Sequence, residues 1–71
     1  MKALELVSEI IKRPLSAADA GVAFRDLDGW DSLKGVVLVL KLERALGRQL
    51  GESELETLAS VNDVDRLLAG A

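Results

Sequence analysis

An aliphatic stretch with helical spacing, SLKGVVLVLKLERAL at residues 32–46, limits what this chain can fold into more than any other feature. Its apolar residues recur every three or four positions, which is the repeat of one face of an α-helix. Gly47 follows, a residue suited to the left-handed conformation that ends many helices. We therefore predict a helix from Ser32 to about Leu46. Its expected core face consists of Gly35, Leu38, Val39, Leu42, Ala45 and Leu46.

Two other segments show the same amphipathic repeat. The first runs from Met1 to about Lys12, just before Pro14, which excludes its preceding residue from helical geometry. The last begins at Ser60, where SVND matches a capping box with Asp63 in place of the usual Glu or Gln. The expected buried faces are Leu4, Val7, Ile10 and Ile11 in the first helix and Val61, Val64, Leu67 and Leu68 in the last.

The segments between these helices carry weaker patterns. Residues 15–30, LSAADAGVAFRDLDGW, have no sustained period and predict a long loop with one helical turn at residues 16–19. Residues 51–60 predict a loop and a short helical turn. The apolar residues expected to contact the core are Val22, Phe24 and Leu27 in the first segment and Leu55 and Leu58 in the second. The fold class is all-α, a bundle of three main helices and one short helix, in one domain over residues 1–71.

Composition excludes several classes of function. The formal net charge of −3 and the pI of about 4.8 argue against a general nucleic-acid binder. The longest fully apolar run, residues 36–40, is far shorter than the roughly 20 residues that cross a bilayer. The N-terminal segment does not resemble a signal peptide. With no cysteine, neither a disulfide nor a thiolate metal site can form. We expect a cytoplasmic protein that binds neither nucleic acid nor membrane.

The helix at residues 32–46 is apolar around more of its circumference than a small core requires. Leu33, Val36 and Leu40 lie away from its core face, with Val37 beside them. An apolar strip next to charged residues is typical of a partner-binding surface. The alternative is that the long loop or the short third helix covers the strip. The neighbouring basic residues are Lys34, Lys41, Arg44 and Arg48.

Ser32 stands where this helix begins, and either Ser32 or Asp31 could serve as its N-cap. Ser32 is a poor candidate for a catalytic nucleophile, because the chain has no histidine to act as its base and nothing indicates that Lys34 loses its proton. Asp26, Asp28 and Asp31 lack the remaining ligands of a calcium loop and predict a solvated turn rather than a metal site. A phosphate-linked group on Ser32, by contrast, would be favoured by the helix N-terminus.

Asp31-Ser32-Leu33, after a long loop and before an aliphatic helix, resembles the acyl carrier proteins. The likeness extends to the loop sequence at residues 24–27, to Leu42-Glu43 and to Ser60-Val61. It implies that Ser32 carries a covalent 4′-phosphopantetheine arm, with Asp31 supporting the modification site. A phosphopantetheinyl transferase would add the arm from coenzyme A. Acyltransferases, ligases or ketosynthases would load and process acyl thioesters on it. The partner-binding residues would be Leu33, Lys34, Val36, Val37, Leu40, Lys41 and Arg44.

Two departures from that family refine the expectation. Carriers of primary fatty acid synthesis are typically acidic along this helix, whereas this chain has Lys34, Lys41 and Arg44. Gly29-Trp30 resembles carriers of polyketide or mixed polyketide–peptide pathways, which make specialised metabolites such as antibiotics, although Trp30 could equally be a plug that fixes the loop. An aminoacyl or peptidyl carrier ranks second, because the Gly-Gly pair usual before its serine is missing. A cofactor-free interaction module, in which Ser32→Ala leaves function intact, remains the competing class.

Overall fold

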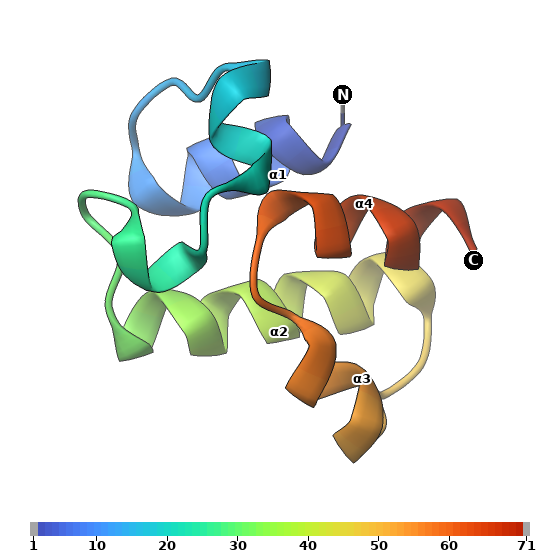
Figure 1. Ribbon diagram of the computed structural model, residues 1–71. Helices are drawn as coiled ribbons and strands as arrows, with labels where there is room; N and C mark the ends of the chain where they lie inside the picture. Colours follow the sequence, from blue (N-terminus) through green and yellow to red (C-terminus); the bar gives the residue numbers. More distant parts are fainter. Residues whose placement is uncertain (1, 71) are drawn as a thin grey trace.

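The computed structural model describes residues 2–70, which form four α-helices and two short 3₁₀ helices (Figure 1). Within this range there is no strand, only an isolated bridge between Ala23 and Ser60. The all-α prediction is confirmed. The helices are α1 (Lys2–Ile11), η1 (Ala17–Gly21), η2 (Phe24–Asp26), α2 (Ser32–Leu46), α3 (Glu52–Thr57) and α4 (Val61–Ala69). Among these residues no helix has the length and hydropathy needed to cross a membrane.

The two predicted helix ends have identifiable stop signals. Gly47 ends α2 in the left-handed conformation with φ 72°, and its N–H donates to the Glu43 carbonyl at 2.9 Å. The residue that follows α1, Lys12, takes the same left-handed conformation with φ 59°. The Arg13 N–H donates to the Ser8 carbonyl at 3.3 Å. This is the hydrogen-bond pattern of a Schellman motif. Met1, where the first helix was expected to begin, lies outside the described residues.

The core lies where α1 packs on α4 and α2 (Figure 1). Its buried residues are Ala3, Val7, Ile10, Ile11, Ala20, Phe24, Leu27, Leu38, Leu42, Leu50, Val61 and Val64. The predicted buried faces were only partly right: Ala45 is exposed, Ala3 is fully buried in place of the half-buried Leu4, and three residues of the predicted α2 core face are half-buried, namely Gly35, Val39 and Leu46. Helical periodicity places a residue on a face but does not set its depth, and the short side chain of Ala45 lies at the margin of the α2 face.

The segment predicted to be a loop contains two 3₁₀ helices, η1 and η2, and is held by hydrogen bonds at several points. Phe24 and Leu27 are buried as predicted, whereas Val22 is half-buried. The Phe24 N–H donates to the Ala59 carbonyl at 2.7 Å, which connects this segment to the link between α3 and α4. Arg13 Nε also donates to the Asp28 carbonyl at 3.1 Å. The segment is therefore a fixed part of the fold.

In the second half of the chain, a carboxylate accepts hydrogen bonds from the backbone at the start of each helix. The Asp63 carboxylate accepts hydrogen bonds from the N–H groups of Ala59 and Ser60 at 2.9 and 3.0 Å, which confirms the predicted start of α4. At the start of α3, Glu54 accepts from the Gly51 N–H at 2.9 Å. The side chains expected to reach the core do so unevenly, with Leu55 41% exposed and Leu58, Leu67 and Leu68 half-buried.

Candidate functional site

The start of α2 presents an exposed serine hydroxyl beside a capping aspartate. Asp31 is the N-cap, and its carboxylate accepts a hydrogen bond from the Lys34 N–H at 2.9 Å. Ser32 is therefore the first helical residue and not the cap. Its side chain is exposed, and the hydroxyl takes part in none of the side-chain hydrogen bonds formed among residues 2–70. The hydroxyl is free to be modified without disturbing a helix cap.

The electrostatics at this helix end suit a phosphate-linked group. The positive end of the helix dipole favours an anion here. The Lys34 N–H and, secondarily, the Lys34 ammonium lower the pKa of Asp31, whose carboxylate lies 3.6 Å from Lys34 Nζ. Lys34 thus offsets the negative charge of Asp31 next to Ser32. A phosphodiester on Ser32 fits this environment, because it adds negative charge where a helix terminus and a lysine are already placed.

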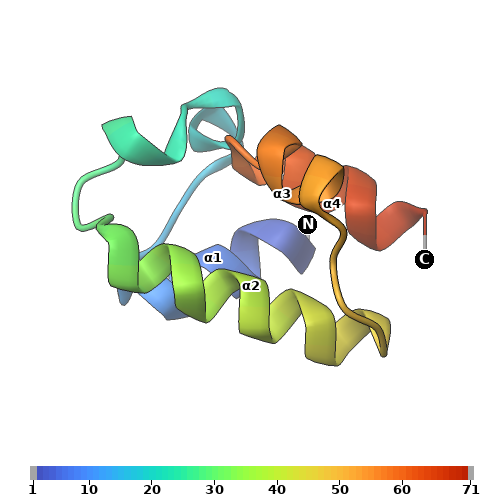
Figure 2. The ribbon, with the colours of Figure 1, turned by 90° about the horizontal axis from the view of Figure 1, so that it is seen from below.

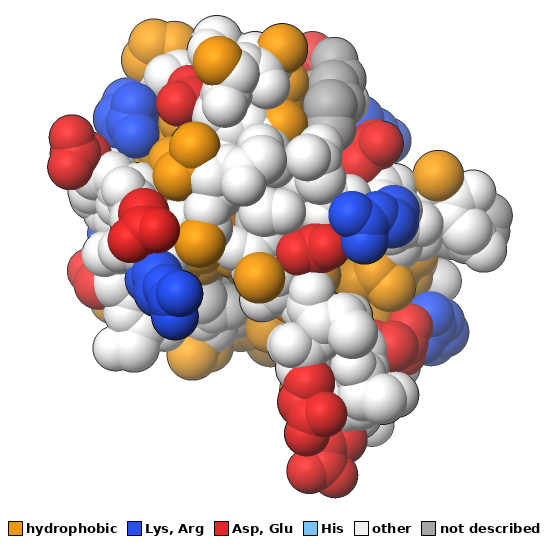
Figure 3. Space-filling model, in the orientation of Figure 1, with side chains coloured by type: hydrophobic (Ala, Val, Ile, Leu, Met, Phe, Trp, Pro, Cys, Tyr) orange, Lys and Arg blue, Asp and Glu red, His pale blue; other side chains and the backbone are white. Residues whose placement is uncertain are grey.

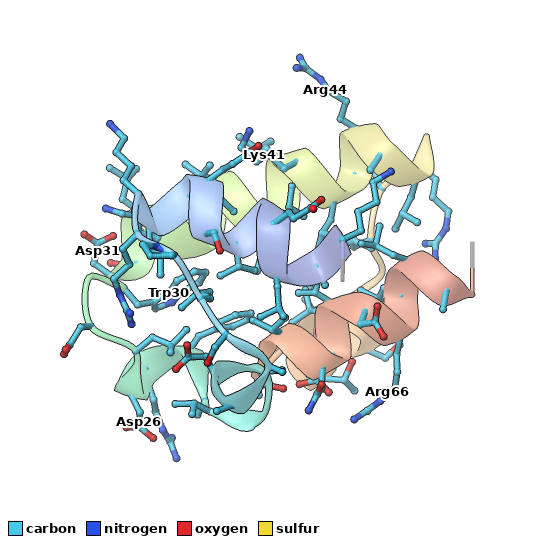
Figure 4. All side chains as sticks on the ribbon, turned by 90° about the horizontal axis from the view of Figure 1, so that it is seen from above. Asp26, Trp30, Asp31, Lys41, Arg44 and Arg66 are labelled. Atoms are coloured by element: carbon cyan, nitrogen blue, oxygen red, sulfur yellow. The ribbon has the colours of Figure 1, made fainter. Side chains whose placement is uncertain are left out.

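The site has no catalytic apparatus of its own. The chain contains no histidine, and Lys34 is directed to Asp31 rather than to a serine. Figure 4 shows Asp26 and Asp31 well apart, at the end of η2 and at the start of α2. In the described part of the chain, no three acidic, histidine or cysteine residues gather into a possible metal site. The solvated-turn interpretation of the aspartates fits this arrangement.

Trp30, two residues before Ser32, packs inward (Figure 4). Its ring stacks on Phe24 and contacts the core, so the interpretation of Trp30 as a plug is confirmed. A cleft of about 530 Å³ opens beside this stack and the first two turns of α2. The sequence did not predict this cleft, since residues from several elements form its walls. The one feature of the sequence that could have indicated it is Gly35, which leaves space because it has no side chain. The cleft is lined by Ala23, Phe24, Arg25, Trp30, Gly35, Leu38, Val39, Leu55, Leu58 and Ala59.

The outer face of α2 carries the predicted apolar strip. Leu33, Val36 and Leu40 are 68%, 56% and 61% exposed, so the alternative in which the loop or α3 covers them is wrong. Figure 2 shows the reason, because the loop and α3 lie across from α2 on one side only. Val37 differs from the other strip residues: it is half-buried and packs against the core, which leaves it a smaller part in any contact with a partner.

Residues 2–68 match the sequence model of a family described as "Phosphopantetheine attachment site". The chain belongs to the phosphopantetheine-binding family. Members of this family hold a covalently attached 4′-phosphopantetheine and serve as carriers, without catalytic activity of their own. The predicted cofactor is therefore confirmed at the level of the family, which is a family of carriers and not of enzymes. The thiol of the arm supplies the reactive group that the chain itself lacks.

Three curated relatives match this member of the phosphopantetheine-binding family over 70 residues, or 92% of its chain. They are the chloroplastic acyl carrier protein of Brassica napus (39% identical), acyl carrier protein 2 of Hordeum vulgare (37%) and acyl carrier protein 5 of Arabidopsis thaliana (37%), the last two also chloroplastic. The match covers 52%, 54% and 50% of these relatives, so the chain spans about half their length. No solved structure gives a significant match.

Proposed function

We propose that this protein is an acyl carrier whose 4′-phosphopantetheine arm is attached to Ser32. The observation that carries the proposal is the exposed Ser32 hydroxyl at the first residue of α2, in a chain whose family is defined by such an attachment. A phosphopantetheinyl transferase forms a phosphodiester between the Ser32 oxygen and the β-phosphorus of coenzyme A. Adenosine 3′,5′-bisphosphate leaves, and the hydroxyl proton passes to a base on the transferase. Asp31 supports the site by capping α2 and by presenting its carboxylate to the transferase.

The arm would hold an acyl group as a thioester, and the cleft would give this group partial shelter. The cleft begins at Gly35, one helical turn after Ser32, and most of its lining is apolar. An apolar acyl chain that folded back along α2 would therefore leave water. Acyltransferases, ligases or ketosynthases are the partners, and the apolar strip of Leu33, Val36 and Leu40 is their contact surface.

A specialised pathway of the polyketide or mixed polyketide–peptide kind is the finer part of this proposal. It is supported by the basic residues of α2, whereas Trp30, which packs on Phe24 as a plug, does not add to this support. The names of the curated relatives specify acyl carriage and contain no pathway. An aminoacyl or peptidyl cargo remains the second candidate, and the cytoplasmic location stays a prediction.

The test is the intact mass of the protein after incubation with coenzyme A, Mg²⁺ and a phosphopantetheinyl transferase of broad specificity. We expect the parent to gain the mass of one phosphopantetheine and Ser32→Ala to gain none. Ser53→Ala is the matched control, because Ser53 is also an exposed serine near the start of a helix, in α3. A folded parent that gains no mass, or a Ser32→Ala variant that still does, would refute the proposal and favour a cofactor-free interaction module.

A further inference from the structure

Positive charge is concentrated on α2. The sequence of this helix includes three basic residues and one acidic residue, although the whole chain has a formal net charge of −3. The one acidic residue, Glu43, is directed to the backbone, where its carboxylate accepts the Leu50 N–H at 2.8 Å. The next helix, α3, has three glutamates and no basic residue, and Figure 3 shows acidic side chains gathered at its end. The outer face of α2 therefore differs in sign from its surroundings.

Ion pairs within the protein sort the basic residues near this face into two groups. Lys34 lies 3.6 Å from Asp31, and Arg48 forms a two-pronged pair with Glu54 at 2.7 and 2.8 Å. Lys41 and Arg44 are exposed and enter none of the salt bridges formed between residues 2 and 70. Fewer basic side chains are therefore available to a partner than the four in the sequence suggest.

The two cations that form no salt bridge lie next to Leu40, at the C-terminal end of the apolar strip. Lys41 follows Leu40 directly, and Arg44 lies one helical turn beyond Leu40, on the same face. Figure 4 shows Arg44 projecting from α2 away from the bundle. A protein that buries Leu40, which is 61% exposed, must bring its own surface up to both cations.

We infer that the partner protein that docks on α2 has an apolar recess bordered by acidic residues. The inference rests on the proposed function, because a carrier must present its arm to other enzymes. Leu33, Val36 and Leu40 would fill the recess, and carboxylates on its rim would pair with Lys41 and Arg44. A basic rim would place like charges together near the buried leucines, and this juxtaposition is strongly unfavourable. Charge complementarity therefore selects one class of docking surface.

The test compares two ketosynthases of known structure, one with an acidic rim and one with a basic rim around the entrance to its active site. Because the chain has no cysteine, Ala69→Cys at the exposed end of α4 gives a single position for a fluorophore. Fluorescence anisotropy then reports binding without the arm. We expect affinity for the acidic rim to be about tenfold higher. The affinity for the acidic rim should fall as the salt concentration rises from 0.1 to 1 M, because the screening length shrinks from about 10 to about 3 Å.

The double variant Lys41→Glu with Arg44→Glu should reverse this preference. Lys2→Glu with Lys12→Glu makes the same change in net charge at the two ends of α1, away from α2, and should leave the preference unaltered. Helicity measured by circular dichroism confirms that each variant is folded. The inference is overturned by equal or absent binding to the two enzymes, by an unchanged preference in the α2 variant, or by salt-sensitive binding to anionic phosphatidylserine vesicles in place of the enzymes. Failure of arm attachment at Ser32 would refute the proposed function separately, since this assay uses no arm.

Discussion

The indole of Trp30 stacks on the ring of Phe24, with ring centroids 4.3 Å apart and an interplanar angle of 11°. Phe24 is itself buried and hydrogen-bonded through its N–H to the Ala59 carbonyl. The stack therefore links the residues just before Ser32 to the connection between α3 and α4. It holds the start of α2 in place and forms one wall of the cleft.

Replacing Trp30 should loosen this arrangement. Trp30→Ala removes a large, partly buried ring and the stacking contact, so we expect the free energy of unfolding to fall by roughly 2–3 kcal/mol. Trp30→Phe retains an aromatic ring and should lose less than half as much. Urea denaturation followed by circular dichroism measures both variants. Equal stability of the Ala and Phe variants would show that the stack contributes nothing.

The helices and their ends could be predicted because their signals are local. The repeat at residues 32–46, the stop at Gly47 and the cap at Asp63 each depend on neighbours within about one helical turn. The prediction that Ser32 is the attachment site depends in the same way on the residues on either side of it. The exposed strip was also predictable, since periodicity shows which residues lie off the core face.

The features that the sequence did not yield depend on contacts between distant segments. The pairing of Arg48 with Glu54 joins the end of α2 to α3, and the cleft has walls from the loop, α2 and α3. The role of Trp30 stayed open between a plug and a sign of the pathway until its contact with Phe24 was seen. Burial of Ala3 rather than Leu4 likewise depends on how closely the helices pack.

Lys12 offers a route to a more stable protein. It has a φ of 59°, in the left-handed region that costs a residue with a Cβ about 1–2 kcal/mol. Glycine avoids this cost but loses more entropy on folding, so we expect Lys12→Gly to raise stability by about 0.5–1 kcal/mol. Lys12→Ala also removes the charge but retains a Cβ, and should give no gain. Thermal unfolding compares the two, and a stabilised Ala variant would point to the charge instead.

Asp31 should have two separable roles. Asn caps helices about as well as Asp, so Asp31→Asn should melt close to the parent, whereas Asp31→Ala should melt a few degrees lower. Both variants lack the carboxylate, and we expect both to accept the arm severalfold more slowly than the parent. Melting curves and a time course of mass gain measure the two effects. Modification of Asp31→Asn at the parental rate would restrict Asp31 to capping.

The ion pair between Arg48 and Glu54 should make the attachment of α3 sensitive to acid. Hydrogen bonds from the Arg48 guanidinium and the Gly51 N–H lower the pKa of Glu54 from 4.5 to about 2. Between these values the unfolded chain binds more protons than the folded one, so falling pH favours unfolding. The contribution of Glu54 is complete above its unfolded pKa and is lost as the pH drops toward 2.

The melting temperature of the parent should exceed that of Glu54→Gln at neutral pH, and the gap should close below pH 4.5. Glu56→Gln, an exposed neighbour in α3, is the control and should show no such closing gap. A difference between parent and Glu54→Gln that stays constant down to about pH 2 would contradict the assignment of this pair.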